Sequence, residues 1–186
     1  MKDKVYKVIR TLTIPPIVVS ILLVSLIINN TIASIEEGFF LVLFLGLIPI
    51  SSYLFNFLIK GNRETQRKTA FIFTFASYFL GFLYALFFVN EVGIKFIYYV
   101  YFFSVVILLI LNLFITKASG HIASVTGLVF ISFHNISTYT LFYTVPIYML
   151  TFVSSKNLKR HTSKELVLGT MTIVISYIIT LLLLHS

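Results

Sequence analysis

Long apolar runs separated by short polar segments make up most of this chain. A helix needs about 20 mostly apolar residues to cross about 30 Å of hydrocarbon. Seven runs approach or reach that length, and the first, fifth and sixth are short. They are Thr11–Ile28, Gly38–Ile59, Thr69–Val89, Ile94–Ile115, His121–Ile136, Thr138–Val153 and Leu166–Leu184. The pattern predicts an all-α, polytopic membrane helical bundle with six to seven transmembrane helices.

The amino-acid composition also indicates a membrane protein. Of the 186 residues, 59% are hydrophobic and only 11% are charged. A soluble domain of this size would have an insoluble surface with such a composition, so we expect one integral membrane domain over residues 1–186. The chain has no cysteine, which excludes disulfides, thiolate zinc sites and a cysteine nucleophile.

The charges lie very unevenly along the chain. If all seven runs cross, one side carries only Lys95 among the basic residues, together with Glu36, Glu37 and Glu91. The positive-inside rule then places the other, basic side in the cytoplasm. The net charge is +8, and no arrangement of basic and aromatic residues suited to nucleic acid is present. We therefore expect the basic loops to orient the spans and to face the lipid phosphates. The basic side carries Lys2, Lys4, Lys7, Arg10, Lys60, Arg63, Arg67, Lys68, Lys117, Lys156, Lys159, Arg160 and Lys164.

The N-terminal region also has an alternative interpretation as a cleaved signal peptide. Lysines precede an apolar run, and Thr31-Ile32-Ala33 resembles a small-residue cleavage site. The length of the apolar run and the polytopic remainder favour a retained helix. Cleavage would leave the predicted orientation of the later loops unchanged.

Three polar loops fall on the basic side, at Lys60–Lys68, Lys117–His121 and Ser154–Glu165. Two predicted spans separate each loop from the next, so all three can meet at one membrane surface. Lysine and arginine stabilise phosphate oxygens, and backbone N–H groups at the start of a helix bind anions. A neutral histidine can attack phosphorus while a second protonates the leaving oxygen. The loops therefore predict phosphoryl transfer without a metal or other cofactor.

The first two loops carry short patterns in a fixed order. Lys60 and Arg67 are separated by six residues, and Lys68 follows directly. The second loop contains Ala118-Ser119-Gly120-His121, a small polar turn that ends in a histidine. Each pattern is weak by itself, and their order on one side is more specific.

The third loop completes the set with Ser154, His161 and Glu165. In this order the patterns resemble KxxxxxxRP, PSGH and SRxxxxxHxxxD of the type 2 phosphatidic acid phosphatases, or lipid phosphate phosphatases. The resemblance covers roughly residues 55–180. The chain is also similar to a small bacterial and archaeal branch of that superfamily. Four positions depart from the family pattern: Lys68 and Ala118 in place of proline, Glu165 in place of aspartate, and Ser155 in place of arginine.

The resemblance implies roles for individual residues. His161 would be the nucleophile that forms a phosphohistidine, Glu165 would orient His161, and His121 would be the general acid. The substrate would be a polyprenyl (di)phosphate or a phosphatidate-type lipid. The residues that would hold its phosphate oxygens are Lys60, Arg67, Ser119 and Gly120, with Lys156 or Arg160 in place of the missing arginine.

The same residues also fit roles that involve no catalysis. The basic residues after Ile59 fit topology anchors that reach the lipid headgroups. Glu165 fits a capping box with Thr162 at the N-cap. Haem ligation would favour histidines that project into the bundle core, whereas His121 and His161 border loops. At the level of the whole protein, the alternative is a non-catalytic relative that binds anionic lipid, a small transporter or a scaffold. The pattern leaves the exact lipid and the oligomeric state open.

Overall fold

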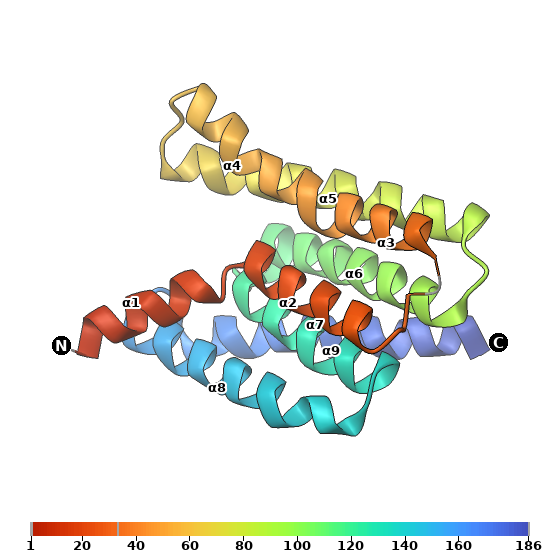
Figure 1. The fold of residues 1–186 in the computed structure, drawn as a ribbon. Helices are drawn as coiled ribbons and strands as arrows, with labels where there is room; N and C mark the ends of the chain where they lie inside the picture. The colour runs from red at the N-terminus through yellow and green to blue at the C-terminus, as the bar shows by residue number, and fades with distance from the viewer. Residues whose placement is uncertain (1, 33, 186) are drawn as a thin grey trace.

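A computed structural model describes residues 2–32 and 34–185, apart from the side chains of Lys2, Arg63 and His185. Ala33, in the alternative cleavage site, lies outside this description. The described residues form helices joined by short connections, with no strand among them (Figure 1). The elements are α1 (Lys2–Leu12), α2 (Pro15–Ile28), α3 (Ile35–Leu41), η1 (Val42–Leu47), α4 (Ile48–Leu58), α5 (Arg63–Phe88), α6 (Val92–Ile110), η2 (Leu111–Ile115), α7 (Gly120–Asn135), η3 (Thr138–Thr140), α8 (Leu141–Asn157) and α9 (Ser163–His185).

The all-helical prediction is confirmed for the described residues, but the count of six to seven spans is not. Within residues 2–32 and 34–185, four helices are long and apolar enough to cross a membrane, or five if the bent pair α1–α2 forms one span. Helices α7 and α8 contain only 16 and 17 residues, fewer than the about 20 that usually cross the hydrocarbon. These four candidate spans are Ile35–Leu58, Glu64–Phe88, Val92–Ile115 and Ser163–Leu184.

Prolines explain where the first apolar runs depart from regular helix. The run predicted from Thr11 is broken, because α1 ends at Leu12 and α2 begins at Pro15, with a bend of 55° between them. Proline starts a helix readily and disfavours helical backbone in the preceding residue, and Ile14 is indeed extended. Pro49 follows a π-helical stretch, since its ring obstructs the regular hydrogen bonding of the turn before it. The first bend places the end of α1 at the site described below.

Helix α6 forms the centre of the bundle. It packs against α5, α7 and α9, and its side chains from Ile94 to Tyr101 are almost all buried. Helix α7 is also largely buried, between α2, α8 and α9. The site therefore rests on the most enclosed helices of the fold.

The three basic loops lie at the same end of the bundle as the N-terminus (Figure 1). The loops after α4 and α8 follow Schellman turns: Lys60 and Lys159 adopt positive φ angles of 51° each, and the next residue's N–H bonds back into the helix. These turns end the two helices sharply. The predicted convergence of the loops at one end is thus present in the fold.

Candidate functional site

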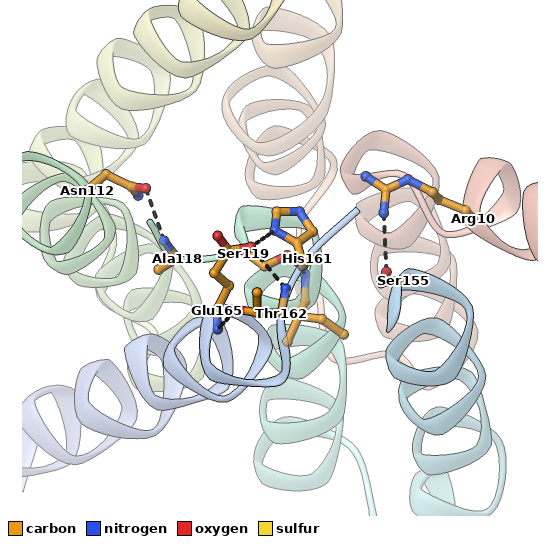
Figure 2. Close-up of polar contacts among 9 residues, drawn as sticks. Arg10, Asn112, Ala118, Ser119, Ser155, His161, Thr162 and Glu165 are labelled. Atoms are coloured by element: carbon orange, nitrogen blue, oxygen red, sulfur yellow. Dashed lines mark hydrogen bonds and ion pairs between the residues drawn. The ribbon is translucent and has the colours of Figure 1, made fainter. Parts of the chain in front are cut away.

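His161 lies in the turn before α9 and contacts Glu165 in the first turn of that helix. The His161 Nδ1 and a Glu165 carboxylate oxygen, Oε2, are 2.8 Å apart (Figure 2). The same oxygen accepts from the Thr162 N–H at 3.2 Å, and the Thr162 hydroxyl accepts from the Glu165 N–H at 3.2 Å. The predicted capping box and the contact with His161 therefore coexist. An ionised carboxylate only accepts, so Nδ1 carries a proton and Nε2 of the neutral ring has the free lone pair.

The surroundings of His161 favour its neutral form. The His161 and Glu165 side chains are only 14% and 19% exposed. Burial lowers the pKa of His161, the contact with Glu165 raises it, and the positive charges of Arg10 and Lys117 lower it, with a net decrease below the ordinary value. A neutral imidazole is the form that can act as a nucleophile.

These opposing influences predict the response of His161 to a change at Glu165. In Glu165→Gln we expect the pKa of His161 to fall further, because the carboxylate that stabilises the imidazolium is lost. Titration of histidine Cε1 resonances in detergent measures this pKa, and His161→Ala assigns the signal. A wild-type midpoint at or above the ordinary histidine value, or a rise in Glu165→Gln, would contradict the expectation.

Ser119 connects the second loop to α9. Its hydroxyl caps α7 by accepting the Ile122 N–H, and its own N–H donates to the Glu165 carbonyl at 3.0 Å. The Asn112 side chain accepts the Ala118 N–H at 3.1 Å and so fixes the start of the same turn (Figure 2). The first N–H groups of α7, including that of Gly120, have no partner within the helix by its geometry. The turn thus lies beside His161 and Glu165 at the N-terminus of a buried helix.

A glycine allows the close approach of α9 to this turn. A Cβ atom at Gly169 would collide with the backbone oxygen of Ser119. The backbones of α7 and α9 therefore meet directly at this point, as small residues permit between membrane helices. This contact sets the position of His121, in the first turn of α7, relative to His161.

His121 contacts a residue that lies far from it in the sequence. Its Nε2 is 3.1 Å from the Thr13 hydroxyl, which also donates to the Ile9 carbonyl at 2.9 Å. Because that hydroxyl proton is engaged, Thr13 accepts from the Nε2–H of His121. Burial lowers the pKa of His121, and electrostatic repulsion from Arg10 and His161 lowers it further, to about 3. The ring of His121 is therefore neutral at pH 7. His121 is the second residue of α7 and so lies next to the second loop, at the end of the helix.

Arg10, near the end of α1, reaches the third loop. Its Nη1 donates to the Ser155 hydroxyl at 3.2 Å, between residues from α1 and α8 (Figure 2). Ser155 is fully buried, and α1 packs along α8. Arg10 also lowers the pKa of both His121 and His161 by its charge. The end of α1 thus contacts both sides of the site, with Arg10 at Ser155 and Thr13 at His121.

The other predicted phosphate-binding cations are placed differently. Lys60 lines a surface hollow with Asn56 and Gln66, and Arg67 is exposed on the first turns of α5. The side chains of Lys156 and Arg160 are also exposed. Among the described contacts, none joins these four cations to His121 or His161. Lys117, on the second loop, is the loop cation whose charge acts on His161.

Sequence reasoning missed Arg10 and Thr13. In the sequence, Arg10 is one of the charges that predict the orientation of the chain, and Thr13 lies inside a predicted apolar run. The available signal was the Pro15-Pro16 pair, which predicts a bend and places the residues before it at the end of a helix. The bend brings Arg10 and Thr13 to the second and third loops.

The comparisons with known proteins identify no relative: no protein-family model, no curated protein and no solved structure matches the chain. Within residues 2–32 and 34–185, no group of three or more histidine, cysteine, aspartate or glutamate side chains could hold a metal ion. A function for this chain therefore has to follow from the geometry of the two histidines and their surroundings.

Proposed function

We propose that this membrane protein is a lipid phosphatase that acts through a phosphohistidine, of the type 2 phosphatidic acid phosphatase kind. The observation that carries the proposal is the His161–Glu165 pair beside the capped turn of Ser119 and the neutral ring of His121. Arg10 and Lys117 add positive charge near the rings. Nucleophile, orienting carboxylate, second histidine and cations are the parts that phosphoryl transfer needs.

In the first step, Nε2 of His161 attacks phosphorus, and the bond from phosphorus to the lipid-side oxygen breaks. The electron pair stays on that oxygen, which takes a proton from His121. A monoester then leaves as the alcohol, and a diphosphate leaves as the monophosphate. Positive charge develops on the imidazole of His161, and Glu165 stabilises it through the Nδ1–H.

In the second step, water attacks phosphorus and the bond from phosphorus to Nε2 breaks. The electron pair returns to the ring of His161, the water proton passes to His121, and inorganic phosphate is released. His121 must be protonated before the first step, although its surroundings hold its pKa low. The negative charge of a bound phosphate opposes the nearby cations and raises that pKa, so that substrate binding itself charges the acid.

The placement of the site favours an amphiphilic substrate. The site lies at the end of a bundle whose long helices are apolar, so a lipid headgroup reaches it from the bilayer. We propose polyprenyl diphosphates or monophosphates first and phosphatidate-type lipids second. We also propose that α2, α7 and α8 cross the bilayer as short spans shielded by their neighbours, and that the basic end faces the cytoplasm.

Phosphate release by purified protein in detergent tests the function. We expect release from farnesyl diphosphate, a longer polyprenyl phosphate or phosphatidate, and we expect it to persist in EDTA because no metal takes part. The preferred substrate then identifies the lipid class. If the wild-type protein releases phosphate from none of the three substrates faster than the His161→Ala variant does, the proposal is contradicted. That result would favour a non-catalytic lipid-binding protein.

A further inference from the structure

The third loop lacks an arginine where its pattern expects one, and Ser155 occupies that position. We propose that Arg10 supplies the missing guanidinium from the N-terminal helix and binds the phosphate oxygens of the substrate between His121 and His161. This inference rests on the proposed function, and it assigns a phosphate-binding role to a residue outside all three loops. Arginine suits the role because its planar fork donates two parallel hydrogen bonds to a phosphate.

The contact with Ser155 puts the charge in the required place. The Arg10 Nη1 lies 3.2 Å from the hydroxyl of the residue that stands in the arginine position. Ser155 is fully buried and has a short, uncharged side chain, so Arg10 brings a guanidinium to a position that carries no charge of its own. In the view of Figure 2, the ring of His161 lies between Glu165 and the Arg10 side chain.

The local fold holds Arg10 at this position. Helix α1 packs on α8, which carries Ser155, and the bend before Pro15 directs the end of α1 toward the loops. Thr13, one turn after Arg10, binds the ring of His121. Within one turn of the chain, Arg10 contacts Ser155 and Thr13 contacts His121. Thr13 is therefore a positioning residue for His121.

The other cations of the third loop do not take the place of the missing arginine. Lys156 and Arg160 are exposed, and the charge that acts on both histidines comes from Arg10. The contact of Arg10 with Ser155 is partly buried, so a phosphate bound there would meet the guanidinium where charge-assisted hydrogen bonds are strong.

Substitution of Arg10 tests the inference with two readouts. In Arg10→Ala we expect kcat to fall by about 10²–10³-fold, as for the loss of one preorganised donor to a transition-state oxygen. We also expect weaker binding of orthovanadate, measured as a smaller thermal stabilisation of the protein. Lys7→Ala removes an exposed charge from the same helix and is the matched control, with both readouts unchanged.

Two rescue experiments separate phosphate binding from a structural role. Guanidinium ion at low concentration should restore part of the activity and vanadate binding of Arg10→Ala, and so should the double variant Arg10→Ala/Ser155→Arg. The free ion needs no repacking, so it keeps the test valid if the double variant does not fold. Wild-type rate and affinity in Arg10→Ala, or a loss that neither rescue reduces, would overturn the inference. If the wild-type protein releases no phosphate, vanadate binding by wild type and Arg10→Ala still decides the role of Arg10.

Discussion

Replacement of His161 by alanine is expected to lower kcat for phosphate release by on the order of 10⁴-fold or more, because the variant loses the nucleophile. The expectation follows from the geometry around the ring. Glu165 holds the Nδ1–H, which leaves Nε2 free to attack, and burial with nearby cations keeps the ring neutral. The backbone of Ser119 bonds to the same glutamate, so the oriented ring lies beside the N-terminus of α7.

Rapid quench with substrate labelled on phosphorus measures the same prediction directly. The wild-type protein should give a phosphoprotein that is labile to acid and stable to base, and His161→Ala should give none. His134→Ala is the matched control, since His134 stacks on Phe96 with ring centroids 4.0 Å apart and bonds the Tyr177 hydroxyl, away from the site. A labelled His161→Ala protein, or equal loss in both variants, would refute the assignment of the nucleophile.

The second large effect is expected at Gly169, a residue that takes no part in the chemistry. In Gly169→Ala the new Cβ collides with the Ser119 carbonyl, so α7 and α9 must separate. Backbone cannot yield as a flexible side chain can, and overpacking of this kind costs about 1–3 kcal/mol. The first turn of α7 carries His121, and a displacement of about 1 Å can lower a rate by about 10²-fold. We expect a lower Tm in detergent together with a loss of kcat of that order.

Gly127→Ala provides the comparison for this effect. Gly127 is also in α7, but a Cβ there would meet Ile173 Cδ1 at 3.5 Å and Tyr101 Cε1 at 3.6 Å, which is ordinary contact. We expect it to retain the wild-type Tm and rate. Equal behaviour of the two variants would show that the contact between Gly169 and Ser119 does not set the geometry of the site.

Local features of the site could be predicted because their partners lie within one helical turn. Thr162 and Glu165 form a capping box that the spacing of three residues already indicates. Ser119 caps α7 for the same reason, and His161 reaches Glu165 from the residue before the cap. Caps depend on backbone groups that every helix end exposes, so short spacing is sufficient to identify them.

The number of spans is harder to predict, because apolar length alone does not tell how many of the shorter helices cross the bilayer. Helix α7 is apolar and nearly as long as a span, yet the bundle encloses most of its side chains. A short apolar run is consistent with either outcome. Packing decides between them, and packing depends on helices that come before and after the run.

The sequence by itself determined the helical class, the membrane environment, the helix caps and the gathering of basic loops at one end of the bundle. Hydrophobic runs and caps are local signals, and a helix forms from them wherever its neighbours lie. Only the tertiary structure decided that Arg10 meets Ser155 across 145 positions and that Thr13 meets His121 across 108. Such pairs arise from how bent and buried helices pack, which no local spacing encodes.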